Sequence, residues 1–166
     1  MRANYEKYAQ VKRERDDAFA RLELKTGLPP YRPVVTPHGY GQQEYRSYGL
    51  FIANDGYAAY DVSIPDVPIG STMSRLTFSQ KLTRLIDKDG KQFFEATIEH
   101  LDRPARDGGH LLREMVKARV HTLSVGIIYK DTDFRWYRSN CLIKRDAGEV
   151  GLSVSFVGQE MITSPT

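Results

Sequence analysis

Residues 120–145 read VHTLSVGIIYKDTDFRWYRSNCLIKR, and this stretch decides the fold class. Between residues 123 and 129 every second position is apolar, the spacing that places side chains on one face of a half-buried β-strand. The polar connection 131–133 leads into a second alternating run over residues 134–145, as expected for a β-hairpin. In that second run Cys141 falls on the face assigned to the core. The stretch therefore predicts two long antiparallel strands with one buried face.

Shorter alternating runs continue the β pattern, separated by turn signals such as Asn54–Gly56 and Asp87–Gly90. In one of them we expect Tyr60, Val62 and Ile64 to share the buried face. The runs cover residues 47–53, 58–64, 72–78, 81–86, 92–101 and 150–157. With the hairpin they make about eight strands. This pattern predicts a mainly β chain folded as an immunoglobulin-like antiparallel β-sandwich.

Two segments depart from the β pattern. Residues 107–118 predict a short inserted helix that begins at Asp107 as N-cap, with an apolar stripe made of Leu111, Leu112, Met115 and Val116. Residues 1–27 predict an N-terminal helix, because they lack proline and contain no glycine before Gly27. The expected organisation is this helix, a Pro- and Gly-rich linker with the first strand over 28–44, and a β-sandwich domain over 45–162.

The N-terminal helix has a thin apolar stripe interrupted by Lys12 and Arg15, which leaves three roles open. It is a solvated helix packed at one end, a tether or self-association element, or a helix that contacts nucleic acid or a membrane surface. The first 26 residues carry seven basic and five acidic side chains, so most of the net charge of +3 lies there and the body is almost neutral. Mixed signs of charge argue against a nucleic-acid partner.

Composition excludes several further classes. With 40% hydrophobic and 27% charged residues the chain is expected to be globular. Its single cysteine excludes an internal disulfide. No apolar run has the length of a signal peptide or of a membrane-spanning helix. We therefore expect a soluble cytoplasmic protein without a membrane span, and a membrane-associated one if the chain is part of a longer protein.

Residues 48–64, YGLFIANDGYAAYDVSI, resemble the N-x-G…A-x-x-V hairpin of immunoglobulin-like sandwich domains in uncharacterised bacterial proteins. The resemblance implies that Asn54–Gly56 form a turn, that Ala59 makes a close contact between strands, and that Val62 lies in the core. Residues 129–137, YKDTDFRWY, are similar to the Y-K-D…W-Y hairpin of such domains. Both motifs are structural, so the resemblance implies a fold and no activity.

Residue types used in catalysis and metal binding are present without the spacing these sites need. Cys141, the only thiol, is expected to be a buried packing residue rather than a nucleophile. The four histidines show no spacing typical of a zinc site. Weaker calcium-binding candidates stand at two predicted turns, where the turn-forming tendency of aspartate is the simpler explanation: Asp87, Asp89, Asp131 and Asp133. We predict no catalytic residue and no cofactor.

The candidate binding residues are Phe134, Trp136 and Arg138. If Tyr137 points into the core with Cys141, then Trp136 and Arg138 are exposed together, and tryptophan and arginine are enriched at binding hot spots. A twist or bulge would instead bury Trp136. The leading hypothesis is a non-catalytic protein-interaction module, with the N-terminal helix as a tether or self-association element. The alternative is a calcium- or lipid-binding sandwich that uses the acidic hairpin tips.

Overall fold

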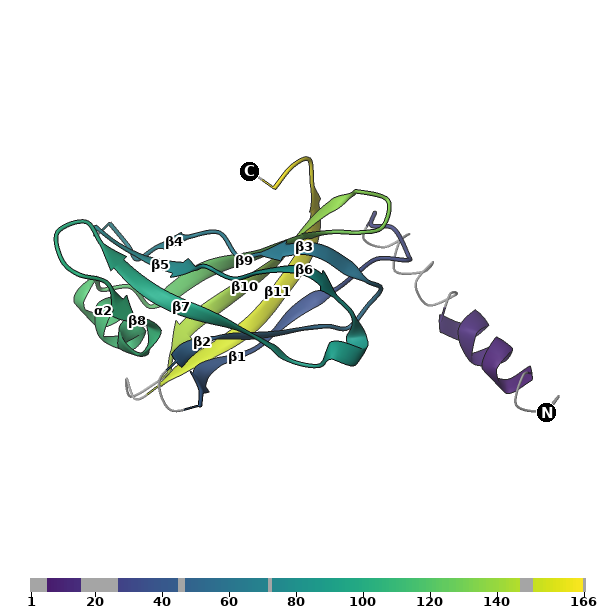
Figure 1. Ribbon diagram of the computed structural model, residues 1–166, viewed down its shortest axis with the longest axis horizontal. Coiled ribbons are helices and arrows are strands. Elements are labelled where there is room, and N and C mark those ends of the chain that lie inside the picture. The colour runs from purple at the N-terminus through teal and green to yellow at the C-terminus, as the bar shows by residue number, and fades with distance from the viewer. Residues whose placement is uncertain (1–5, 16–26, 45–46, 72, 147–150, 166) are drawn as a thin grey trace. The chain divides into compact units, whose positions relative to one another are not determined.

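The structure is a computed structural model (Figure 1), and the residues that it describes are 6–15, 27–44, 47–71, 73–146 and 151–165. The chain divides into two compact units, Met1–Arg32 and Pro33–Thr166. In the first unit residues 6–15 are helical, which confirms an N-terminal helix, while positions 1–5 and 16–26 of that prediction lie outside the described residues. Near the end of this unit the guanidinium of Arg32 donates a hydrogen bond to the carbonyl of Pro29 at 3.0 Å.

The second unit is a sandwich of two antiparallel sheets (Figure 1). The six-stranded sheet has the spatial order β1 (Val35–Gln43), β2 (Ser47–Asn54), β7 (Gln92–His100), β5 (Ser74–Phe78) and β4 (Val67–Pro68), with β8 (Arg106–Asp107) paired to β7. The five-stranded sheet has the order β11 (Leu152–Ile162), β10 (Trp136–Arg145), β9 (Thr122–Lys130), β3 (Ala59–Ser63) and β6 (Lys81–Leu85). The predicted mainly β sandwich is confirmed, with eleven strands in the described residues instead of about eight.

Three short helical elements interrupt the strands: η1 (Asp87–Asp89), η2 (Gly108–His110) and α2 (Leu111–Lys117). The predicted inserted helix is confirmed, but its apolar stripe is only half buried. Leu111 and Met115 lie in the core, whereas Val116 is 39% exposed. The inward face of this short helix is formed by Leu111, Glu114 and Met115, three and four residues apart, so Val116 points away from the core. Asp107 caps the η2 turn, where its carboxylate accepts from the Gly109 amide at 2.8 Å.

The core lies between the two sheets and is built from the alternating positions of the strands. The inward face of the 120–145 hairpin is buried as predicted, and its residues are Leu123, Val125, Ile127, Tyr129, Tyr137, Cys141 and Ile143. From the opposite sheet Leu50, Phe94 and Ile98 are completely buried against them. The two-residue periodicity of the sequence therefore determines which side chains form the core.

A β-bulge in β3 corrects one predicted face. The pairing of β3 with β9 shifts register between Tyr60 and Ser63, and Asp61 within this step has a φ of 50°. One extra residue reverses the alternation of side chains. As a result Ala59 and Val62 are buried in the core, while Tyr60, predicted to share the face of Val62 and Ile64, lies half-buried outside it.

The last strand is longer than its predicted span of 150–157, and its alternation is also broken. A second register shift, between Asn140 and Cys141 of β10, pairs Cys141 with Phe156 and Asn140 with Gly158. Val157 is therefore left without an opposite partner in this pairing and is 62% exposed. Phe156 is 42% exposed.

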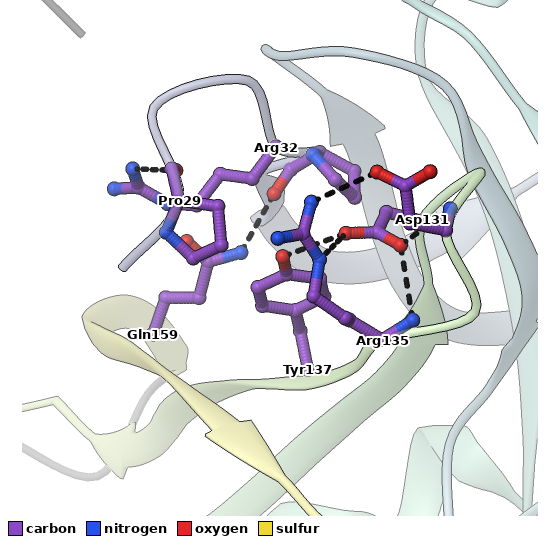
Figure 2. A network of polar contacts seen from close by, with 8 residues as sticks. Pro29, Arg32, Asp131, Arg135, Tyr137 and Gln159 are labelled. Atoms are coloured by element: carbon purple, nitrogen blue, oxygen red, sulfur yellow. Dashed lines mark hydrogen bonds and ion pairs between the residues drawn. The ribbon is translucent and has the colours of Figure 1, made fainter. Parts of the chain in front are cut away.

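Polar contacts close one long side of the sandwich. The buried hydroxyl of Tyr129 lies 2.6 Å from Ser139 Oγ and accepts from the side-chain amide of Gln159 at 2.7 Å. It also accepts from the Val35 amide at 3.3 Å, and the Gln159 amide donates to the carbonyl of Pro33 at 2.6 Å (Figure 2). These bonds tie β1 of one sheet to three strands of the other.

None of the helices in the described ranges is both long enough and apolar enough to cross a bilayer.

Candidate functional site

A row of outward-facing side chains crosses three strands of the five-stranded sheet. Trp136 of β10 stands opposite Lys130 of β9, and Lys130 stands opposite Tyr60 of β3. Their sequence neighbours Tyr129 and Tyr137 point into the core and are completely buried. Because side chains alternate along a strand, the row lies on the outer face of the sheet. The bulge in β3 is what brings Tyr60 into it.

The ammonium group of Lys130 lies among two aromatic rings and a carboxylate. Its Nζ is 5.0 Å from the ring centre of Phe134 and 5.6 Å from that of Trp136. The same atom forms an ion pair with Asp61 at 2.8 Å. A cation over an aromatic face is attracted by the ring quadrupole, so Lys130 holds both rings in place. We call Tyr60, Lys130, Phe134 and Trp136 the aromatic face.

Two hollows flank the Lys130–Asp61 pair. One, of about 330 Å³, is lined by Tyr60, Asp61, Thr83, Lys130, Asp131, Thr132 and Phe134. The other, of about 420 Å³, is lined by Asp61, Ser63, Lys81, Leu82, Thr83, Trp136 and Pro165. Asp61 and Thr83 line both, so the hollows are neighbours on one surface. Their walls combine ring faces with a few charged and hydroxyl groups, the composition typical of binding sites.

The turn that carries Phe134 is organised around the buried carboxylate of Asp131 (Figure 2). Its Oδ1 accepts from the backbone amides of Asp133 at 2.8 Å and Arg135 at 3.0 Å. Its Oδ2 accepts from Arg135 Nε and from the Tyr137 hydroxyl, each at 2.8 Å. The backbone closes the turn through the Phe134 amide, which donates to the Asp131 carbonyl at 3.2 Å. One carboxylate therefore fixes the whole turn.

The ionisation of Asp131 follows from these contacts. Burial by itself would raise its pKa, since a carboxylate loses hydration away from water. The hydrogen bonds from the Arg135 amide, the Tyr137 hydroxyl and the Arg135 guanidinium outweigh burial, and together they lower the pKa of Asp131 below its ordinary value. Asp131 is therefore charged at neutral pH. The same ion pair raises the pKa of Arg135.

Phe134 occupies an unusual position at the tip of this turn. Its φ is 63°, in the left-handed region that bulky residues rarely adopt, and its side chain is 74% exposed. This is the position of a hairpin turn where glycine or asparagine is normally found. A large aromatic ring is thus displayed in a strained conformation that the Asp131 contacts maintain.

The structure brings together two of the three predicted binding residues. Phe134 and Trp136 both lie against Lys130, and the partial exposure of Trp136 excludes a place in the core. Arg138 lies on the outer face of β10 as well, but it forms an ion pair with Glu160 at 3.1 Å and lines neither hollow. Nothing in the sequence singles out Lys130, because a lysine at the end of a strand is typical of a solvated position.

The acidic residues considered as calcium ligands form contacts within the turns that carry them. Asp89 accepts from the Ile86 amide at 2.8 Å and caps η1, which also contains Asp87. Asp133 forms an ion pair with Arg135 at 3.1 Å, and both carboxylate oxygens of Asp131 already accept from protein donors. Within the described ranges no three metal-ligating side chains gather in one place.

Cys141 is a packing residue of the interior. Its side chain is 1% exposed, and burial raises its pKa to about 12. The thiol therefore stays protonated at neutral pH, whereas nucleophilic attack requires the thiolate. Its sulfur lies 3.7 Å from the carbonyl of Ser139, a weak contact within its own strand.

Comparisons of the chain with models of protein families, with curated proteins and with solved structures find no match.

Proposed function

We propose that this chain is a non-catalytic protein-interaction module and that the aromatic face is its contact surface. The observation that carries the proposal is Phe134, which combines a 74% exposed ring with a φ of 63°. Folding gains little from a bulky residue at such a position, since asparagine or glycine adopts it at lower cost. A strained, exposed aromatic side chain fits a role in binding.

The surroundings of Phe134 support this role. Aromatic side chains supply most of the energy of many protein interfaces when they enter a partner's surface or receive its side chains. Here the ring is held by the Asp131 contacts and by Lys130, so little conformational entropy is lost when a partner binds. The turn is therefore suited to act as a preformed anchor.

The hollows suggest what the partner presents. The hollow between Tyr60 and Phe134 accepts an apolar side chain, while Lys130 Nζ, a donor with three hydrogens, is placed for a backbone carbonyl beside it. An extended peptide segment offers both groups at the spacing of neighbouring residues. We therefore assign the face to an extended segment of a protein partner.

Affinity capture with matched variants tests the proposal. Phe134→Asn removes the ring and suits the left-handed backbone, and Trp136→Ala removes the second ring. Phe156→Ser is the control, because Phe156 is another partly exposed aromatic residue, on β11. We expect the specific partner to be lost from both face variants and kept by the control, with all three proteins folded. Retention of the partner by Phe134→Asn and Trp136→Ala would refute the proposal.

We also propose that the sandwich is of the immunoglobulin-like type and is related to the bacterial domains with the N-x-G…A-x-x-V hairpin. What supports it is the turn after β2. There Asn54 Oδ1 accepts from the amides of Gly56 at 2.9 Å and Val34 at 3.2 Å, and its Nδ2 donates to the Leu85 carbonyl at 2.9 Å. The side chain of Asn54 thus connects three segments of the chain by hydrogen bonds. An experimental structure whose strand connections differ from those of immunoglobulin domains would reject this assignment.

The helical segment 6–15 is proposed as a self-association or tethering element. Tyr8 and Val11 are 71% and 56% exposed and stand three residues apart, which places them on one face of the helix. If this face pairs with a second copy, light scattering of the full chain gives the mass of a dimer, and Tyr8→Ser with Val11→Ser gives a monomer. A monomeric unmodified chain would exclude self-association.

A further inference from the structure

The end of the sandwich farthest from the aromatic face carries a second exposed cluster. Strand β9 begins just after α2, and Lys130 is its ninth and last residue, so about 30 Å separate the two ends. Met73, Leu101 and Val116 are 65%, 74% and 39% exposed there. Figure 1 shows α2 and the connection between β7 and β8 together at that end. We call these three residues the apolar tip.

The chain pairing brings the residues of the apolar tip together. Ser74 of β5 stands opposite His100 of β7 in an antiparallel pairing, so Met73 and Leu101 both follow on the same side of that pair. The turn before β5 lies against the end of α2, because a side chain at Gly70 would collide with Val120 and contact Ala118. Val116 belongs to this same helix end.

Buried polar contacts beneath the tip join the three segments that carry it. Ser74 Oγ lies 2.6 Å from His100 Nδ1, and His100 Nε2 lies 3.9 Å from Glu114 Oε1 of α2. The side chains of His100 and Glu114 are 0% and 4% exposed. Each is a close neighbour in sequence of a tip residue, so the apolar side chains project from a fixed platform.

The segment that carries Leu101 and Val116 is basic, although Arg103 pairs with Asp102 at 3.8 Å and, next to Met73, Arg75 pairs with Asp66 and Glu99. Residues 101–121 contain three acidic side chains, of which Glu114 is buried, and five basic ones, namely Arg103, Arg106, Arg113, Lys117 and Arg119. Lys117 Nζ lies 4.0 Å from Glu114 Oε1 and is half exposed. Protruding apolar side chains with basic residues around them are typical of surfaces that insert shallowly into an anionic bilayer.

We propose that this end of the domain docks on an anionic lipid surface. Met73 and Leu101 enter the boundary between headgroups and acyl chains, and Arg113 and Lys117 lie against the phosphates. Long basic side chains suit this depth, since their stems cover apolar surface while the charged ends stay hydrated. The lipid surface is distinct in position and chemistry from the protein partner assigned to the aromatic face.

Vesicle co-flotation of the full chain tests this inference. We expect binding to vesicles that contain phosphatidylserine, none to pure phosphatidylcholine, and release at high salt because the attraction is electrostatic. Met73→Ser with Leu101→Ser, and separately Arg113→Glu with Lys117→Glu, are each expected to weaken binding roughly tenfold or more. Phe134→Asn is the matched control at the other end and is expected to bind the vesicles as the unmodified chain does.

Three results would overturn the inference: no flotation with phosphatidylserine vesicles, flotation unchanged in both tip variants, or an equal loss in Phe134→Asn. The substituted side chains are exposed, and unchanged melting temperatures would show that the variants remain folded. Because the control separates the two ends of the domain, a failure of lipid binding would not refute the aromatic face as a protein contact surface. Loss of the protein partner in Phe134→Asn would likewise say nothing against lipid binding at the apolar tip.

Discussion

The hydroxyl of Tyr137 donates a hydrogen bond to Oδ2 of Asp131 over 2.8 Å, so the turn between β9 and β10 is fastened to a core residue of β10. Tyr137 in turn stacks on Tyr129 with ring centres 5.9 Å apart. The exposed ring of Phe134 is thereby connected to the interior through one carboxylate. This connection holds the turn in place while the ring of Phe134 stays exposed to a binding partner.

Replacing Asp131 by Asn is expected to destabilise the fold. The variant loses the ion pair between the buried Asp131 carboxylate and the partly exposed Arg135, and it loses a charged acceptor for Tyr137. This change costs about 2 kcal/mol in the free energy of unfolding at neutral pH, because solvent screens the Arg135 side of the pair. Urea denaturation of the two proteins gives this difference directly. A loss well below 1 kcal/mol would show that the carboxylate does not hold the turn.

The same residue predicts a pH dependence. The pKa of Asp131 is lowered in the folded protein, so its contribution is fully present above the unfolded value of about 4 and is lost as the pH falls through the folded value. The stability difference between the unmodified chain and Asp131→Asn should therefore shrink on acidification. Denaturation curves at a series of acidic pH values check it, and a difference that stayed constant would contradict the assignment.

Phe134 allows strain to be separated from contact. Phe134→Ala keeps the left-handed backbone and loses the ring, whereas Phe134→Asn loses the ring but suits that backbone. The left-handed conformation costs most residues roughly 1–2 kcal/mol, so we expect the Asn variant to be about 1 kcal/mol more stable than the Ala variant. Thermal denaturation measures this difference. Equal stability would mean that the turn relaxes and stores no strain.

Gly49 of β2 is expected to tolerate no side chain. A Cβ at this position would overlap the carbonyl group of Phe94 in the paired strand β7. Backbone atoms cannot move aside as a flexible side chain can, so Gly49→Ala should cost about 3 kcal/mol. Gly41→Ala in β1 is the matched control, since nothing lies within 4 Å of its added Cβ. Comparable melting temperatures for the two variants would refute this contact.

Cys141 is expected to react only after unfolding. Its pKa is raised to about 12 by burial, so the thiolate needed for alkylation is scarce in the folded state up to mildly alkaline pH. Mass spectrometry after iodoacetamide treatment should show no adduct in the native protein and one adduct in denaturant. Rapid labelling of the native protein would mean that the thiol is accessible and would reopen a nucleophilic role.

The long hairpin and the face that it buries were predictable because the period of two persists over many residues. Tyr60 was placed on the wrong face, since the bulge at Asp61 depends on pairing with β9, which local periodicity does not contain. The two-residue strands β4 and β8 were too short for any periodic signal. Strand number was therefore underestimated although the class was right.

The candidate site was predictable only in part for the same reason. Phe134 and Trp136 stood out by residue type, but their common neighbour Lys130 is defined by cross-strand register. The role of Asp131 required knowing that the Tyr137 hydroxyl reaches back to the turn. Contacts between strands, rather than residue identity, gather these groups into one surface.

Photocrosslinking is the most direct test that the aromatic face binds a protein. A photoreactive phenylalanine analogue is placed at residue 134 and, in a matched protein, at residue 157, whose native side chains are 74% and 62% exposed. After irradiation in an extract of the source cell, we predict a discrete protein adduct from position 134, its loss when Trp136→Ala is added, and none from position 157. No adduct from position 134, or equal adducts from both positions, would contradict the assignment of the aromatic face as the contact surface.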